Sequence, residues 1–125
     1  MKNFDYYKIR EFFYKNGTNN INQFKLIDLS IYLNYSKKTT SRKLILYNNL
    51  SYLKFAPGKG RGHLSKVIFE MDFHDEIIKI QTCDLVACDF ILLLELSQLD
   101  IPKDWFSPFI NKINKQFSPI SNIRN

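Results

Sequence analysis

Cysteine is scarce in this sequence, with only Cys83 and Cys88, five positions apart in an apolar stretch. So few cysteines exclude the disulfide framework of a small secreted domain, and reduced cytosolic thiols are the preferred interpretation. On a helix this spacing places the two thiols on different sides, which disfavours a shared metal site that also uses His74, Asp84 and Asp89. We therefore predict no metal site and expect these side chains to be packed.

Long apolar runs are also missing. The longest, Phe90 to Leu94, lies between Asp89 and Glu95, far short of the ~20 residues that a membrane-spanning helix requires. The first residues, Met1 to Tyr6, lack the apolar core of a signal peptide. We expect a cytoplasmic, nucleoid-associated protein with no membrane contact.

Motifs for catalysis are lacking as well. The two histidines, His63 and His74, have no nucleophile or carboxylate at an informative spacing. Gly58, Gly60 and Gly62 do not match a phosphate-binding loop, and a predicted strand follows them where a dinucleotide site would open a helix. We predict no enzyme, no catalytic residue and no cofactor.

Charge is plentiful and unevenly distributed. Residues 1–66 contain 13 Lys and Arg against 3 Asp and Glu, a net charge of +10, whereas residues 67–125 contain 5 against 9, a net charge of −4. A basic half joined to a mildly acidic half indicates that the first binds a polyanion and the second has another task, such as self-association. We divide the chain into a DNA-binding domain, residues 1–73, and a helical extension, residues 74–125, for dimerisation or linkage.

The apolar spacing predicts the elements of the first domain. Three helices, a short edge strand and two later strands are predicted at residues 4–15, 25–33, 36–49, 21–24, 50–55 and 64–71. Asn34 suits a left-handed turn between two helices, and Tyr35 is expected to enter the core. A basic, glycine-rich loop joins the last two strands. This order is typical of a winged helix-turn-helix, mainly α with a small antiparallel β-hairpin (α+β).

Additional helices are predicted in residues 74–125. Apolar residues dominate from Asp75 to Leu99, as two helices or as one with a break near Thr82. Ser107 and Pro108 are predicted to cap and start a last helix that Ser118-Pro119 terminates. We expect these helices to pack on the first helix and to form a homodimer contact.

The helix at residues 36–49 carries the candidate site. Ser36 is the predicted N-cap, and Thr40, Leu44 and Tyr47 form an inward stripe. Lysine and arginine on the other sides can donate to base edges and phosphates of double-stranded DNA. The predicted DNA-binding residues are Ser36, Lys37, Lys38, Thr39, Ser41, Arg42 and Lys43 on this helix, and Lys59, Arg61 and His63 on the glycine-rich loop.

Residues Pro57 to Ser65, after a helix-turn-helix that ends in Tyr52-Leu53, resemble the wing of the N-terminal DNA-binding domain of the SgrR family of bacterial transcription regulators. Lys59 stands where arginine is expected, which conserves the charge. The resemblance extends from about Gln23 to Phe69 and implies promoter binding. It also implies a large C-terminal solute-binding domain that senses a small molecule, and such a domain does not fit here. We therefore expect the chain to be either an excised fragment or a short stand-alone relative, and no ligand sensing is carried over.

Three alternatives stay open. The basic side of the helix can be an ordinary solvated face, as charge runs usually are. A winged helix can also serve as a protein-interaction module that uses its C-terminal helices. A plasmid or phage replication initiator would make the same DNA contacts for a different outcome, and the sequence does not separate it from a repressor or an activator.

Overall fold

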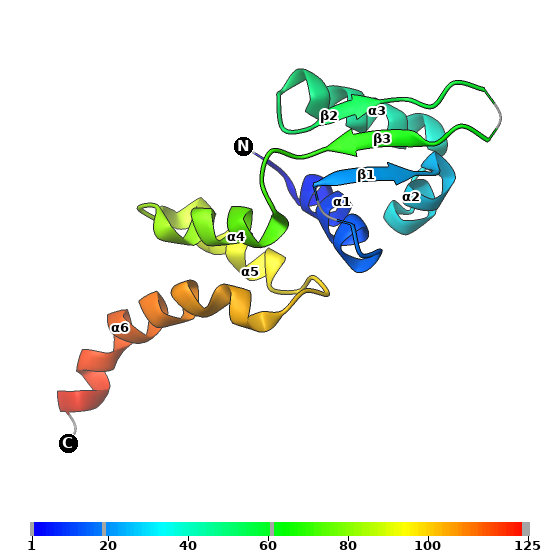
Figure 1. Cartoon of the computed structure of the whole chain (residues 1–125). Coiled ribbons are helices and arrows are strands. Elements are labelled where there is room, and N and C mark those ends of the chain that lie inside the picture. Colours follow the sequence, from blue (N-terminus) through cyan, green and yellow to red (C-terminus); the bar gives the residue numbers. More distant parts are fainter. Residues whose placement is uncertain (1, 19, 61, 124–125) are drawn as a thin grey trace. The chain divides into compact units, whose positions relative to one another are not determined.

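The computed structural model describes residues 2–18, 20–60 and 62–123, with side chains as far as Lys115. In this part of the chain, six α-helices and a small three-stranded antiparallel sheet form a mainly helical α+β structure (Figure 1). The predicted class is confirmed at this level. The elements in order are α1 (Phe4–Lys15), β1 (Ile21–Phe24), α2 (Leu26–Leu33), α3 (Lys37–Asn49), β2 (Lys54–Ala56), β3 (Ser65–Ile68), α4 (Phe73–Thr82), α5 (Ala87–Leu96), the 3-10 helix η1 (Lys103–Phe106) and α6 (Ser107–Ile123).

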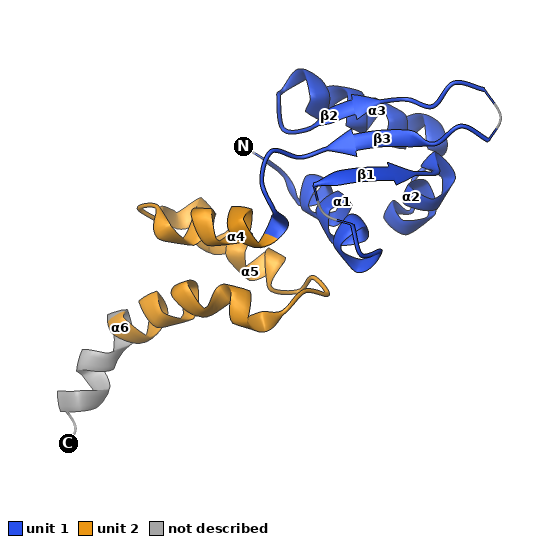
Figure 2. Ribbon diagram, in the orientation of Figure 1, with its two compact units in different colours: residues 1–73 blue, residues 74–125 orange. Residues whose placement is uncertain are grey.

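The chain divides into two compact units, residues 1–73 and residues 74–125 (Figure 2). We call them the N-terminal unit and the C-terminal unit. The first contains α1, the helix pair α2 and α3, and the whole sheet, while the second is helical.

In the N-terminal unit, β3 is the central strand and pairs antiparallel with β1 on one side and β2 on the other. The predicted edge strand at residues 21–24 is confirmed as β1. The two later strands are shorter than predicted: the first because residues 50–53 form a turn, and the second because the chain bends at Glu70 and Met71. Ser51 adopts a φ of 62°, which is incompatible with an extended strand, and the Tyr52 N–H donates to the Tyr47 carbonyl.

Aromatic rings join the sheet to the helices. The Phe13 ring of α1 lies edge-to-face against Phe24 of β1, with 5.0 Å between centroids, and contacts Phe69 just after β3. Tyr6, also on α1, contacts Tyr47 of α3 with 5.8 Å between centroids. Such edge-to-face pairs add to the stabilisation from burial alone, so this cluster fixes α3 relative to the sheet.

The C-terminal unit is organised around Gln81, which is fully buried at the end of α4. Its amide nitrogen donates to the carbonyls of Ile77 and Trp105, and its amide oxygen accepts from the Phe109 N–H at 2.8 Å. Gln81 therefore satisfies a free N–H in the first turn of α6, which Ser107 was predicted to do. That prediction is wrong, because Ser107 is itself helical and its hydroxyl donates to Asp104.

Other expectations for this unit have mixed outcomes. The predicted break near Thr82 is confirmed, since α4 ends there and α5 begins at Ala87. The predicted end of the last helix at Ser118-Pro119 is wrong, because α6 continues through both residues to Ile123. Cys83 and Cys88 are exposed, so the packing predicted for them is also wrong. Cys83 directly follows α4 and Cys88 lies in the first turn of α5, and neither is among the buried residues. No helix in the described part of the chain is long and apolar enough to cross a membrane.

Candidate nucleic-acid interface

The junction between α2 and α3 sets the direction in which α3 leaves the core. Asn34 adopts the left-handed conformation, with φ 60° and ψ 41°, as predicted. The Tyr35 N–H then donates to the Ser30 carbonyl at 3.0 Å, which closes the turn. Ser36 follows as the N-cap of α3, and its hydroxyl oxygen accepts from the Thr39 N–H at 3.1 Å. The turn and the cap together make a tight connection between the two helices.

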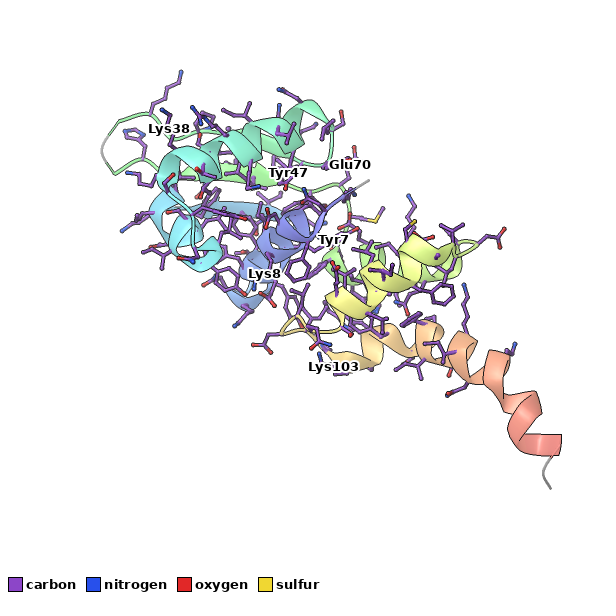
Figure 3. The ribbon with its side chains drawn as sticks, turned by 180° about the vertical axis from the view of Figure 1, so that it is seen from behind. Tyr7, Lys8, Lys38, Tyr47, Glu70 and Lys103 are labelled. Carbon is purple, nitrogen blue, oxygen red and sulfur yellow. The ribbon has the colours of Figure 1, made fainter. Side chains whose placement is uncertain are left out.

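Helix α3 faces the core with one stripe and solvent with the rest. Thr40, Leu44 and Tyr47 are buried, as predicted. Lys38 and Arg42 lie four positions apart on the opposite side and are exposed. Figure 3 shows Lys38 near the end of α3 that begins at the turn, and Tyr47 on the side of the helix that faces α1. This exposed side can reach an external partner without changing the core.

A cleft of about 460 Å³ lies between α3, the start of α2 and the loop that joins β2 to β3. It brings together three of the predicted site residues, Lys37, Ser41 and His63. None of its lining side chains within the described residues is acidic. The lining residues are Lys25, Leu26, Ile27, Lys37, Ser41, Phe55, Pro57, Gly58, Gly60, Gly62, His63 and Ser65. We call this hollow the basic cleft.

The base of the β2–β3 loop is closed by a close approach of its two arms. A Cβ atom at Gly58 would lie 2.5 Å from the His63 carbonyl oxygen, so no larger residue fits there. The Gly58 N–H donates to the Ser65 hydroxyl at 3.1 Å. Lys59 is exposed in the same loop, and Arg61 lies outside the described residues. The loop is thus a closed structure that carries a cation beside the basic cleft.

The first turn of α3 carries its positive charges at an unfavourable position. Lys37 and Lys38 occupy it, and it holds no acidic residue. By contrast, α1, α2, α4 and α5 have acidic residues in their first turns, where the helix dipole favours them. The free N–H groups and the lysines at the start of α3 together favour a bound anion.

Lys43 is placed differently from the other cations of α3. Its ammonium forms an ion pair with the Asp5 carboxylate, with 2.9 Å between Nζ and Oδ2. Tyr35 joins this group from outside the core, since 38% of its surface is exposed and its hydroxyl lies 3.1 Å from Asp5 Oδ2. The prediction that Tyr35 enters the core is therefore wrong, because the Asp5 carboxylate holds its hydroxyl at the surface.

Two of the predicted site residues have structural hydrogen bonds. Besides its bond from the Thr39 N–H, the Ser36 hydroxyl lies 3.0 Å from the Thr39 hydroxyl. Both side chains thus stabilise the start of α3. Their position beside Lys37 and Lys38 still leaves them at the exposed end of the helix.

The sequence reasoning did not identify Lys25 as a site residue. Lys25 is the N-cap of α2 and is exposed, and it lines the basic cleft together with Lys37. The available signal was its position at the start of the first helix of a helix-turn-helix, where the chain lies close to the amino end of the second helix.

The described side chains contain no group of three or more His, Cys, Asp or Glu residues that could hold a metal ion. A comparison of the sequence and the structure with protein-family models, curated proteins and solved structures finds no match.

Proposed function

We propose that this chain is a winged helix-turn-helix protein that binds double-stranded DNA in a sequence-specific manner and regulates transcription in the cytoplasm, at the nucleoid. In this proposal α3 enters the major groove, and the β2–β3 loop contacts the adjacent minor groove or backbone. The element order α1, β1, α2, α3, β2, β3 and the antiparallel hairpin that closes the sheet support the winged-helix assignment. The resemblance of residues 57–65 to the wing of the SgrR family belongs to the same proposal.

The observation that carries the proposal is the basic cleft. Lys25 and Lys37 come from the starts of two different helices and line one hollow, with no acidic lining residue among the described ones. Two cations held at one cleft match a sugar-phosphate backbone, which is a continuous polyanion.

The exposed side of α3 supports sequence reading in addition to phosphate contact. Lys38 and Arg42 lie one helical turn apart and face solvent. Arginine and lysine donate to the O6 and N7 atoms of guanine in the major groove. A cleft that grips the backbone beside such a helix would hold these two side chains against base edges.

The test is the affinity of the full chain for random duplex DNA across a salt series. We expect log affinity to fall steeply and linearly with log salt concentration, because each neutralised phosphate contributes a slope of about 0.9. In the Lys25→Gln/Lys37→Gln variant the slope should decrease by about two. No binding at low salt would contradict the proposal.

A matched control comes from the C-terminal unit. Lys79→Gln/Lys115→Gln also removes two exposed lysines and changes the net charge equally. Its salt slope should equal that of the unsubstituted chain. An equal decrease of the salt slope in the two variants would mean that binding depends on net charge alone, without a defined site.

A further inference from the structure

Lys43 is held by a cluster that joins three parts of the N-terminal unit. Asp5 lies in the first turn of α1, Tyr35 in the α2–α3 turn and Lys43 in the middle of α3. The Lys43 ammonium lies 2.9 Å from Asp5 Oδ2 and 5.1 Å from the centroid of the Tyr35 ring. The Tyr35 hydroxyl is within 3.2 Å and 3.1 Å of the two carboxylate oxygens of Asp5. We call these three residues the Asp5 cluster.

The cluster is partly shielded from water. The Lys43 and Asp5 side chains are 26% and 28% exposed, so solvent screens their attraction less than it screens a fully exposed pair. The hydrogen bond that Lys43 donates to Asp5 is the main cause that raises the pKa of Lys43 above its ordinary value, against a smaller opposing effect of burial. The ammonium therefore has a carboxylate and an aromatic ring as partners within its own chain.

The other cations of α3 lack such a partner. In the described part of the chain, Lys37, Lys38 and Arg42 form no ion pair. A cation with no internal partner can neutralise a phosphate at little cost, whereas Lys43 would first have to give up its bond to Asp5. The helix thus contains two kinds of cation that the sequence alone does not distinguish.

We infer that Asp5 is a specificity-determining residue of the DNA contact: it withholds Lys43 from the phosphates, so that α3 binds the backbone with fewer charges and depends more on its base contacts. This inference rests on the proposed function. Phosphate contacts are independent of sequence, so each cation withheld from the backbone lowers the affinity for random DNA. The same Asp5 cluster fixes the start of α1 against α3, which keeps the orientation of α3 constant.

The test compares Asp5→Asn, Lys43→Met and the double variant with the unsubstituted chain, on random duplex DNA across a salt series. Asp5→Asn removes the charge with little change of shape, and Lys43→Met keeps much of the aliphatic stem. Lys43→Met should leave the salt slope unchanged, because Lys43 does not contact phosphate. Asp5→Asn should steepen it by about one, a further fall in affinity of about fourfold between 50 and 200 mM salt. The double variant should return to the original slope.

Lys37→Met provides the matched reference, since it removes a lysine of the same helix that lines the basic cleft. Its slope should decrease by about one. If Lys43→Met decreases the slope as much as Lys37→Met does, Lys43 contacts phosphate and the inference is wrong, although the proposed function stands. If the unsubstituted chain binds no DNA at low salt, the inference about Asp5 and the proposed function are both wrong.

A purely structural role of Asp5 has a different signature. In that case Asp5→Asn would lower the thermal stability, and its salt slope would stay the same or become shallower. Circular dichroism melting of each variant, together with the ratio of affinities for a selected site and random DNA, separates the two roles. We expect this ratio to fall in Asp5→Asn and to recover in the double variant; a ratio unchanged in Asp5→Asn would contradict the inference.

Discussion

In the C-terminal unit, Lys103 and Lys112 donate to main-chain carbonyls near the carboxyl ends of α5 and α4, respectively. In the N-terminal unit, by contrast, Lys37 and Lys38 lie at the amino end of α3. The Lys103 ammonium is bound by the carbonyls of Ser97 and Leu99, and that of Lys112 by those of Gln81 and Cys83. The carbonyls at the end of a helix lack partners within it and carry the negative end of its dipole. Lysine there stabilises the fold.

Lysine at the amino end has the opposite effect, because the helix dipole is positive there. A cation at that end lowers the stability of the free protein, and its cost is offset when an anion binds. The contrast teaches that the same residue type serves different purposes at the two ends of a helix: Lys103 and Lys112 stabilise the C-terminal unit, whereas in our proposal Lys37 and Lys38 of the N-terminal unit bind DNA. Each of the following changes tests that contrast.

The largest effect is expected from removing core volume in each unit. Leu44 of α3 and Leu93 of α5 are fully buried, and Leu→Ala at such positions lowers the free energy of unfolding by about 2–5 kcal/mol. Leu44→Ala should reduce DNA binding as well, because it loosens α3. Leu93→Ala should leave binding intact at a temperature where residues 1–73 stay folded, which hydrogen exchange can verify. Equal loss of binding in both would show that the units do not act separately.

The next effect concerns the amino end of α3. Lys37→Glu/Lys38→Glu should weaken DNA binding about 50- to 100-fold near 0.1 M salt, because the phosphate contact of Lys37 and the base contact of Lys38 are lost. The same change should raise the free energy of unfolding by about 1 kcal/mol, because acidic residues suit the helix dipole at this position. Titration with duplex DNA measures the affinity, and urea denaturation measures the free energy of unfolding. A variant that loses both binding and stability would contradict the contrast.

Lys112→Met tests the lysines of the C-terminal unit. It removes the bonds from the ammonium to the carbonyls of Gln81 and Cys83, which should lower the free energy of unfolding by about 1 kcal/mol. DNA affinity should not change. Lys115→Met, at an exposed position of the same helix, is the control and should have little effect on either quantity. Weaker DNA binding by Lys112→Met would assign this unit a part in the contact.

The smallest effect is a loss of stability of the N-terminal unit at alkaline pH. The pKa of Lys43 is raised above 10.5, chiefly by its hydrogen bond with Asp5, and burial raises the pKa of Tyr47 above 10.0. Both groups hold their proton more tightly in the folded chain than in the unfolded one. Their contribution to stability is therefore complete below pH ~10 and is lost as the pH rises through the folded-state pKa values.

Urea denaturation at neutral and alkaline pH measures this decline. Tyr47→Phe removes one of the two titrating groups, so the decline should become shallower, although stability at neutral pH also falls because the hydrogen bond from Tyr47 to Asn3 is lost. An unchanged pH dependence in this variant would mean that Tyr47 does not contribute to it.

Local signals predicted much of the N-terminal unit. The bounds of α1, the left-handed Asn34 and the Ser36 cap each depend on residues a few positions apart, and all are confirmed. The buried stripe of α3 follows from helical spacing alone, and it is confirmed too. Turn and cap chemistry is encoded within a few residues, which is why the sequence is sufficient there.

The misses have non-local causes. Tyr35 stays at the surface because Asp5, thirty positions earlier in the chain, holds its hydroxyl. Ser107 is not the cap of α6 because Gln81 supplies that bond from α4. Lys25 joins the basic cleft only because the helix turn brings it near Lys37. The homodimer contact of the C-terminal helices, like the DNA contact itself, stays a prediction.

The close approach of Gly58 and His63 makes the tip of the β2–β3 loop an exchangeable part. Because the two arms meet at the base of the loop and the Ser65 hydroxyl accepts the Gly58 N–H there, the residues between them do not have to close the loop themselves. We therefore expect changes in the number and charge of these residues to leave the register of β2 and β3 unchanged. A tip grafted from another protein, or lengthened by a reporter peptide, would be attached to the same base. The distance over which the loop can contact a partner could therefore be changed by design.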